Sequence, residues 1–339
     1  MSVLFHLTIP SPALPASEAV HQEIAALQTH FGGELNYLYP FRRPGVRAPR
    51  QIYGLHQLLS LRKKERQFSL HHIFNADLFP FPALAWLRKP VVYTVVAGLP
   101  HHPPRLSRWF EEAVHTVVVS NRRDLRTIRE WGIARCAIVP PGIDLGRFRY
   151  SPPPDNGLFT ILAGSAPWTI KQFHQKGVDL LFSAAQKLPD LRLVLLWRGL
   201  LLEALQERIR QYELEGRVEV IARQVDVNIV LGRVHAAVVL SDRPEIVKAC
   251  PHSLLESLAA GKPVLVSQCI PFADYVHERN CGEVVDRFNE TELIAAIKNL
   301  MSNYPRRQAC AREAGQQDFS LEGMVQGYGQ IYAECGLRP

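Results

Sequence analysis

The sequence predicts an α/β protein built from two consecutive doubly wound, Rossmann-like domains. The chain has 339 residues, of which 47% are hydrophobic and 21% are charged, which leaves room for about two domains with sizeable cores. Short apolar runs alternate with helical patterns along the first half, and the same alternation starts again after a proline-rich stretch. Strands that are apolar on both faces indicate parallel sheets covered by helices.

Six strands are expected in the first half. The apolar start of the chain is expected to be the first buried strand and not a signal peptide, because no basic residue precedes it. Asn121 can cap a helix that contains Leu125 and Ile128, and Gly132 can end it. The expected strands cover residues 3–8, 35–39, 72–75, 91–96, 117–119 and 137–139.

A proline-rich segment separates the halves. Residues 150–157 read Y-S-P-P-P-D-N-G, and three consecutive prolines cannot continue a helix or a central strand. The first domain is therefore placed at residues 1–150 and the second at residues 151–320, with residues 321–339 expected to form a C-terminal helix that can pack back across the domains. Ligands bind outside the carboxyl ends of such strands, so the two sets of crevices are expected to face a central cleft. The strands expected in the second half cover residues 159–163, 193–197, 218–221, 236–240, 264–267 and 283–285, and the helices cover residues 178–188, 201–214 and 253–260.

Several classes of protein do not fit the sequence. No apolar run reaches the roughly 18 residues of a membrane-spanning helix, because Arg192, Arg198 and Glu203 interrupt the most apolar stretch. The six cysteines form no C-x-x-C pair, so a reducing cytoplasm is expected. His71 and His72 are neighbours in a predicted strand and point to opposite faces, so no metal site is expected. The sequence has no G-x-S-x-G, H-E-x-x-H or P-loop motif.

Positive charge is concentrated in the first half. Residues 1–150 hold 19 Lys and Arg against 10 Asp and Glu, a net charge of +9, whereas residues 151–339 hold 20 against 22, a net charge of −2. Eight of the basic residues lie between positions 42 and 66, where Glu65 is the one acid. This half is expected to attract anionic lipid headgroups or an anionic acceptor, with a solvated charged face as the alternative. Nucleic acid is not expected as a partner, because no recognised nucleic-acid module accompanies the charge.

The segment after the fourth expected strand of the second half carries the most chemistry. A helix begins at Pro251, and the N–H groups of Ser253 and Leu254 at its start have no partner within the helix. Together with the helix dipole they predict a phosphate site. Glu256, one turn into the helix, can accept two hydroxyl groups of a ribose. The alternative is an ordinary helix whose early glutamate complements the dipole.

This segment resembles the donor-site helix of GT-B fold glycosyltransferases, in particular the retaining family 4 enzymes. The family pattern is roughly E-G-F-G-x-x-x-L-E-A-M-A-x-G-x-P-V, and residues 255–264, L-E-S-L-A-A-G-K-P-V, match its second half. Residues 139–144, V-P-P-G-I-D, followed by Phe148, are similar to the family's I-P-N-G-V-D-x-x-x-F. Residues 175–181, Q-K-G-V-D-L-L, are similar to its E-K-G-x-x-x-L, and the three matches stand in the family's order.

The resemblance implies a donor site in the second domain and an acceptor site in the first. By resemblance, Lys176 neutralises the leaving diphosphate and Glu256 binds the ribose of the nucleotide. The backbone of Ser253 and Leu254 completes the diphosphate site. Lys248 stands where the family places a glutamate near the donor sugar, and it joins Lys176 as a catalytic candidate. The other donor-side candidates are His252, Ser165, Lys171, Arg198 and Arg223, and the acceptor-side candidates are His101, His102, Arg42 and Arg43.

Other positions also depart from the family pattern. Ser165 replaces an arginine, and Lys171 is expected to supply the missing charge. Glu245 could replace the lost glutamate only if its loop is rearranged. The glycine-rich first loop is absent, and Ala97 replaces a histidine, with His101 and His102 following shortly after.

The sequence therefore predicts a cytoplasmic, peripheral membrane glycosyltransferase of cell-envelope polysaccharide or glycolipid synthesis. By resemblance, it would transfer a hexose from a nucleotide sugar with retention and without a metal or cofactor, and the acceptor would be a glycan or an anionic lipid-linked molecule. The alternative is a catalytically silent GT-B protein that binds a nucleotide, a glycan or a partner. A basic nucleic-acid binder, the third reading, predicts salt-sensitive binding without base preference.

Overall fold

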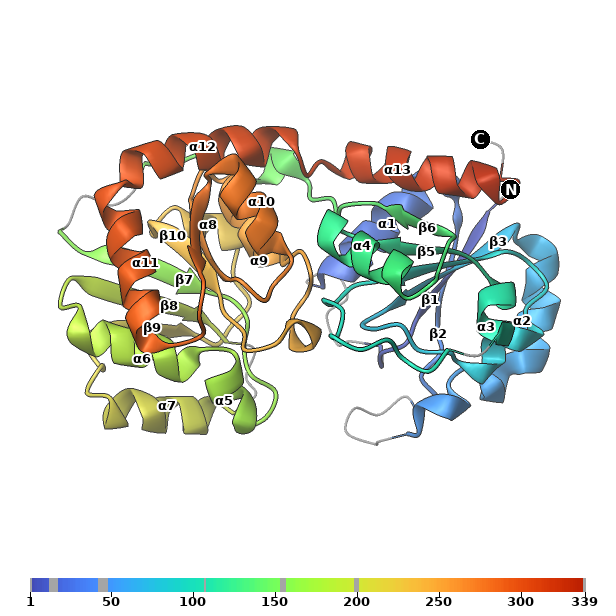
Figure 1. The fold of residues 1–339 in the computed structure, drawn as a ribbon, viewed down its shortest axis with the longest axis horizontal. Coiled ribbons are helices and arrows are strands. Elements are labelled where there is room, and N and C mark those ends of the chain that lie inside the picture. Colours follow the sequence, from blue (N-terminus) through green and yellow to red (C-terminus); the bar gives the residue numbers. More distant parts are fainter. Residues whose placement is uncertain are drawn as a thin grey trace. The chain divides into compact units, whose positions relative to one another are not determined.

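The computed structural model describes residues 2–11, 18–41, 48–106, 108–152, 157–197 and 201–337 (Figure 1). The chain forms two compact units. Unit 1 consists of residues 1–143 and 321–339, and unit 2 consists of residues 144–320. The sequence places the boundary after residue 150, whereas unit 2 already begins at Asp144. The reason is local contact, because the Arg149 N–H donates to Oδ1 of Asn228 and the Ser151 carbonyl accepts from Lys262.

Unit 1 contains a six-stranded parallel sheet in the order β2-β1-β3-β4-β5-β6 (Figure 1). All six strands expected from the sequence are present, and the predicted doubly wound architecture is confirmed. Strand β1 lies between β2 and β3, with Leu7 opposite Tyr37 on one side and Phe74 on the other. The strands are β1 (Val3–Leu7), β2 (Gly33–Tyr37), β3 (Leu70–Asn75), β4 (Val91–Val95), β5 (Val114–Val119) and β6 (Cys136–Ile138).

Helices cover both faces of this sheet. Helices α1 (Ala19–Phe31) and α13 (Leu321–Glu334) pack against the face that carries Val3 and Phe5. Helices α3 (Arg108–Ala113) and α4 (Arg122–Glu130) cover the other face together with α2 (Leu58–Lys64). The Asn121 side chain accepts from the Asp124 N–H and caps α4, as the sequence predicts. In both units, the 3-10 helices among the described residues are Arg50–Ile52, Leu55–Gln57, Glu65–Gln67, Pro82–Trp86, Leu145–Arg147 and Pro244–Ile246.

The C-terminal helix α13 belongs to unit 1 through a buried histidine. Nδ1 of His72 lies 2.5 Å from the Tyr332 hydroxyl, and Nε2 lies 2.7 Å from Oγ1 of Thr94. Burial lowers the pKa of His72 well below its usual value, so the ring is neutral. His71 points the opposite way, with Nε2 3.0 Å from Oε1 of Glu65, which confirms the predicted alternation of the two histidines.

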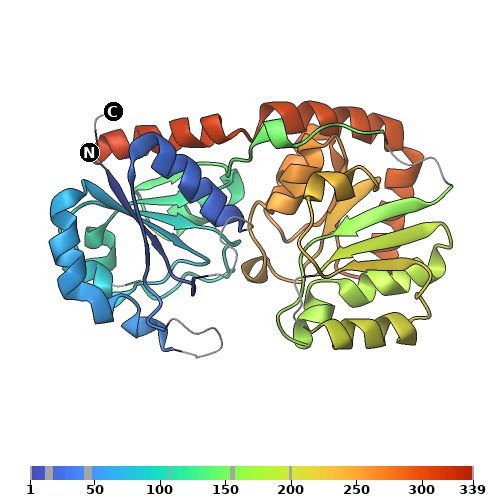
Figure 2. The ribbon, with the colours of Figure 1, turned by 180° about the vertical axis from the view of Figure 1, so that it is seen from behind.

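Unit 2 contains a second six-stranded parallel sheet, in the order β12-β11-β10-β7-β8-β9 (Figures 1 and 2). The chain starts in the middle at β7, moves outward through β8 and β9, and then returns to place β10 on the other side of β7. This strand order has its switch point between β7 and β10. The strands are β7 (Phe159–Ala163), β8 (Leu191–Leu196), β9 (Val218–Ile221), β10 (Ala236–Val239), β11 (Val264–Ser267) and β12 (Gly282–Val285).

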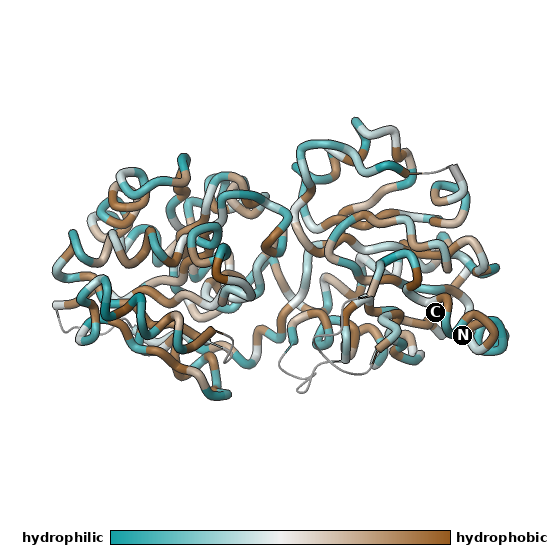
Figure 3. The backbone as a smooth tube through the Cα atoms, turned by 90° about the horizontal axis from the view of Figure 1, so that it is seen from below, coloured by the Kyte–Doolittle hydropathy of each residue, from teal (hydrophilic) through white to brown (hydrophobic). Residues whose placement is uncertain are grey.

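The helices of unit 2 also form two layers. One face of the sheet packs against α6 (Val178–Lys187), α7 (Leu202–Gln211) and α11 (Glu290–Ser302). On the other side, α9 (His252–Ala259) contacts β10 and β11, and α10 (Phe272–Arg279) contacts β11 and β12. The hydrophobic segments in Figure 3 follow the strands inside each unit, as covered parallel sheets require. The remaining helices are α5 (Lys171–Gln175), α8 (Val227–Leu231) and α12 (Tyr304–Gln317).

Helix α12 braces α9 through a glycine. A Cβ atom on Gly315 would lie 2.0 Å from the carbonyl oxygen of Leu258, so the two helices approach more closely than any side chain would allow. The position of α9 therefore depends on this contact. Within the described part of the chain, no helix combines the length and apolarity needed to span a bilayer.

A buried lysine fixes the segment that enters unit 2. Lys262 is 0% exposed, and its Nζ donates to the Ser151 carbonyl at 2.8 Å. Burial disfavours the charged form and lowers the pKa of Lys262 to about 8.

We expect this lysine to make the stability of unit 2 depend on pH. The pKa of lysine in an unfolded chain is about 10.4, so above pH 8 the unfolded state holds more protons than the folded state. The free energy of unfolding should then rise with pH, by about 1.5 kcal/mol between pH 8 and about pH 9.5 relative to Lys262→Met. Urea denaturation of both proteins across this range measures the difference. A difference that stays constant with pH would contradict the prediction.

Candidate functional site

Two segments meet at the carboxyl ends of β7 and β10, on the two sides of the switch point. Gly164 and Ser165 follow β7. The loop that begins near Ser241 follows β10 and leads into α9 at His252. Ligands of open parallel sheets bind at such a switch point, so this edge of unit 2 is the candidate site.

The first turn of α9 lies directly against the end of β7. A Cβ atom on Gly164 would lie 3.4 Å from Cβ of Ser253, which shows how closely the two segments approach. The N–H of Ser253 has no acceptor within the described residues, as predicted for a helix start. The N–H of Leu254, in contrast, donates to the Pro251 carbonyl at 3.0 Å. The expectation of a free N–H at Leu254 is therefore wrong, because the first turn closes on Pro251.

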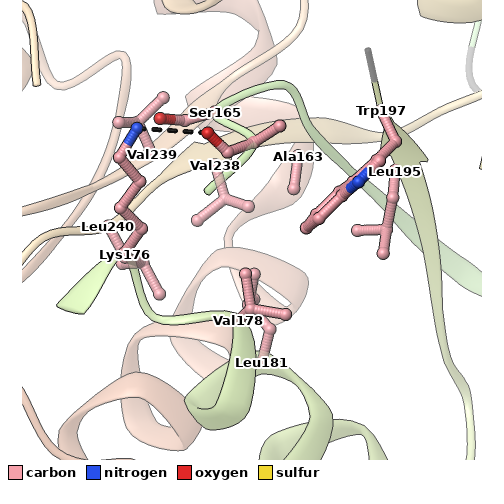
Figure 4. Close-up of a pocket in the computed structure, with 11 residues that line it drawn as sticks. Ala163, Ser165, Lys176, Val178, Leu181, Leu195, Trp197, Val238, Val239 and Leu240 are labelled. Atoms are coloured by element: carbon pink, nitrogen blue, oxygen red, sulfur yellow. Dashed lines mark hydrogen bonds between the residues drawn. The ribbon is translucent and has the colours of Figure 1, made fainter. Parts of the chain in front are cut away.

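Lys176 lies at the end of α5 and turns its side chain into this edge (Figure 4). The residue is 9% exposed, and Nζ donates to the Ala166 carbonyl at 3.2 Å. Burial lowers the pKa of Lys176. Because this ammonium group is mostly buried, water screens its positive charge only weakly. The charge therefore favours a neighbouring anion.

A small cavity lies beside Lys176. Its volume is ≈ 20 Å³, which is room for about one water molecule. Ser165, Trp197 and Leu240 line it together with the lysine (Figure 4). Trp197 stands immediately after β8 and packs with its ring centroid 5.5 Å from that of Phe173. Sequence reasoning missed Trp197, although its place at the end of an expected strand was a usable signal.

A left-handed glycine fixes the turn that presents Lys176. Gly177 has φ of +69°, and a Cβ atom there would lie 2.6 Å from Cβ of Leu240. The Asp242 N–H donates to the Gln175 carbonyl at 2.9 Å, so the loop after β10 holds the same turn from its other side. Glycine is required both for the backbone conformation and for the close approach.

Lys248 and His252 are paired in the loop before α9 and in its first turn. Nζ of Lys248 lies 3.5 Å from Nδ1 of His252, whose ring is buried. An ammonium can only donate, so in this contact Nδ1 of the histidine accepts. Glu256 lies one turn further along α9 and is half-buried. Glu245 lies in the short helix Pro244–Ile246, where its Oε2 atom is buried without a partner among the described residues.

The other candidates that the structure describes lie outside this group. Lys171 is exposed at the start of α5, so Lys176 and not Lys171 lines the cavity. Arg223 is exposed after β9, an edge strand two positions from β7. In unit 1, His101 and His102 are exposed in the segment after β4. Arg198, Arg42 and Arg43 lie outside the described residues.

The arrangement can bind a phosphate-like anion. It combines the Lys176 ammonium, the Ser253 N–H and the positive end of the α9 dipole, and each of these favours negative charge. The same groups would stabilise charge that develops on a departing phosphate. Within the part of the chain that the structure describes, no group of three His, Cys, Asp or Glu side chains could hold a metal ion.

Comparison with known proteins finds a family that is similar to the segment holding this site. The family model of glycosyl transferases group 1 matches residues 171–317, which include α5 and α9. Lipopolysaccharide glucosyltransferase WaaG of Escherichia coli (strain K12) is 30% identical over 148 residues, which are 42% of this chain. The matched segment spans 38% of the length of that relative.

Solved structures share the fold over nearly the whole chain. Sucrose-phosphate synthase from Thermosynechococcus elongatus superposes with a TM-score of 0.75 at 14% identity, covering 98% of this chain and 99% of that one. Anabaena Alr3699/HepE in complex with UDP gives 0.71 at 15% identity, with 98% and 100% covered. The crystal structure of WaaG gives 0.65 at 18% identity, with 97% and 99% covered. Residues 171–317 therefore match the glycosyl transferases group 1 model, and the chain has the two-unit GT-B fold of these solved structures.

Proposed function

We propose that the protein transfers a sugar from a nucleotide-sugar donor, bound at the switch point of unit 2, to an acceptor held by unit 1. The observation that carries this proposal is the buried Lys176 ammonium, which contacts the segment after β7 against which α9 begins. Lys176 and α9 both lie within the residues that match the family model. HepE has been solved with UDP and with UDP-glucose, which supports uracil as the first base to test.

In the proposed mechanism, Lys176 and the Ser253 N–H stabilise the diphosphate as it leaves the sugar. Glu256 accepts hydroxyl groups of the ribose from its place one turn into α9. Stabilising a departing charge and orienting the acceptor are sufficient for this transfer, so no protein nucleophile, metal or cofactor is assigned. Transfer of a hexose with retention follows the resemblance to the family 4 enzymes.

The proposed acceptor is a glycan or an anionic lipid-linked molecule of the cell envelope. The net charge of +9 in residues 1–150 supports an acceptor that carries phosphate. The similarity of 148 residues of this chain to a lipopolysaccharide glucosyltransferase supports the same class. We accordingly propose action at the cytoplasmic face of the membrane.

Calorimetric titration with UDP, GDP, ADP and CMP tests the donor site. We expect one nucleoside diphosphate to bind with micromolar affinity, and the matching nucleotide sugar to release it faster in the presence of a lipid extract. If none of the four nucleotides binds, the proposed donor site is wrong.

A second candidate function is a silent GT-B protein that binds without transferring. Lys248 favours it, because the cation stands where the family has a glutamate near the donor sugar. Lys248→Glu separates the two candidates, since the substitution places a carboxylate beside Nδ1 of His252. A transferase adapted to Lys248 should lose about tenfold in kcat/KM, about 1.4 kcal/mol. A silent protein should show no nucleotide release before or after the substitution.

A further inference from the structure

The outer face of α2 is a stripe of one apolar and three basic side chains. Leu59, Arg62, Lys63 and Arg66 follow one another at helical spacing, so they share one face of α2 and of the 3-10 turn that continues it. Leu59 is 84% exposed, and the three basic residues are exposed as well. An exposed apolar side chain rimmed by cations marks an interaction surface when further apolar surface adjoins it.

The inner face of the same helix is packed into the core. Leu61 joins Leu4, Leu38 and Phe68 in a buried cluster. Glu65 is buried as well and accepts from the Arg88 N–H at 2.7 Å. The stripe is therefore held on a rigid base, and α2 lies at the outside of unit 1 (Figure 1).

A second segment extends this surface. Trp86, at the end of the short helix Pro82–Trp86, is 53% exposed, and the Arg62 guanidinium carbon lies 5.9 Å from its ring centroid. Arg88 and Lys89 follow directly and are exposed. The contact between Glu65 and the backbone of Arg88 places them beside the stripe. We call the seven side chains together the α2 face: Leu59, Arg62, Lys63, Arg66, Trp86, Arg88 and Lys89.

The positive charge of the α2 face is not neutralised by the described part of the chain. None of its five cations has an acidic partner among the residues that the structure describes. The nearby acids are engaged elsewhere, since Glu34 pairs with Lys64 at 2.6 Å and Glu65 is buried against His71. An ordinary solvated surface mixes both signs of charge and exposes few large apolar side chains.

We propose that the α2 face docks the protein on an anionic phospholipid bilayer. Tryptophan favours the membrane–water interface, and Leu59 would enter the same layer. Each Lys or Arg near an anionic membrane adds attraction of about 1 kcal/mol, so the five cations together would hold the α2 face at the membrane surface. The combination of apolar tips with surrounding cations fits lipid headgroups above acyl chains better than a soluble polyanion, which would leave Leu59 and Trp86 unused.

The biological role of this membrane docking rests on the proposed function, because an enzyme bound to a bilayer can reach a lipid-linked acceptor. Its evidence is separate, since the α2 face lies in unit 1 and the proposed donor site lies in unit 2. The two can therefore fail independently.

Co-sedimentation with vesicles tests the inference. The protein should sediment with vesicles of phosphatidylcholine and phosphatidylglycerol at low salt and less so as salt rises, and it should stay in the supernatant when the vesicles are pure phosphatidylcholine. Arg62→Glu with Lys63→Glu should lower the partition coefficient at least about tenfold. Leu59→Glu should lower it by several fold, and Trp86→Phe should remove a blue shift of tryptophan emission on binding.

Matched variants in unit 2 serve as controls. Ile229 is 65% exposed, and Lys298 and Arg306 are exposed basic residues, so Ile229→Glu and the pair Lys298→Glu with Arg306→Glu repeat the same chemistry elsewhere. These controls should bind vesicles like the wild type. Equal binding to both kinds of vesicle, no binding, or equal losses in the controls would overturn the inference. UDP titration of every protein keeps the outcomes distinct, because loss of nucleotide binding with vesicle binding intact counts against the proposed function alone.

Discussion

Lys176→Ala is expected to lower the affinity for the bound nucleoside diphosphate at least about tenfold, and the rate of sugar transfer by about 10² to 10³. The side chain is 9% exposed, and its burial lowers its pKa, so its charge is weakly solvated before a ligand arrives. A diphosphate bound beside this ammonium group supplies the favourable interaction that water does not. The effect on the rate should exceed the effect on binding, because charge on the diphosphate grows as the sugar departs.

The matched control is Lys171→Ala. Lys171 is exposed at the start of the same helix α5, so its removal changes the net charge equally without touching the cavity. Its titration should resemble that of the wild type, and Lys176→Arg should keep part of the affinity because the charge remains. Calorimetry of the three variants and single-turnover nucleotide release provide the measurements. Equal losses for Lys171→Ala and Lys176→Ala would mean that only net charge matters, which the proposed site does not allow.

The fold could be predicted from the sequence because strands and helices of this architecture are marked by local patterns. All twelve expected strands are present, and Phe159–Ala163 and Val264–Ser267 have the predicted bounds. Strand starts were predicted less well. Gly33 begins β2 with φ of +126°, in a place where a Cβ atom would lie 1.9 Å from the Val3 carbonyl oxygen. In the sequence, such a glycine indicates a turn. Its place in a strand depends on the close approach of the neighbouring strand, which the local pattern does not contain.

The candidate site could be predicted in part, for reasons that differ between residues. Lys176 and Ser253 stand next to motif glycines and prolines, so their surroundings follow from local conformation. Arg223 follows a strand whose place at the edge of the sheet depends on the order of all six strands, and the sequence pattern does not contain that order. The hydrogen bond of the Leu254 N–H depends on how tightly the first turn closes, which residue types at a helix start do not determine.

Gly177→Ala is expected to destabilise unit 2 by about 2 to 5 kcal/mol and to weaken nucleotide binding at the same time. Left-handed backbone costs a residue with a Cβ atom about 1 to 2 kcal/mol. The new Cβ would also meet Leu240, which is 2% exposed and cannot move aside without disturbing the core, at a further cost of about 1 to 3 kcal/mol. The turn would shift, and Lys176 would move with it because it directly precedes Gly177.

Gly132→Ala separates these two contributions. Gly132 is also left-handed, with φ of +88°, but a Cβ atom there would meet nothing within 4 Å. It should therefore lose only the conformational part, about 1 to 2 kcal/mol, and bind nucleotide like the wild type. Urea unfolding and calorimetry of both variants measure the comparison. If the two glycines cost the same and nucleotide binding survives in both, then the contact between the Lys176 turn and Leu240 does not position the lysine, and the cavity would have to tolerate a displaced ammonium group. If Gly177→Ala alone loses binding, the geometry of one turn at the switch point connects the packing of unit 2 to its proposed chemistry.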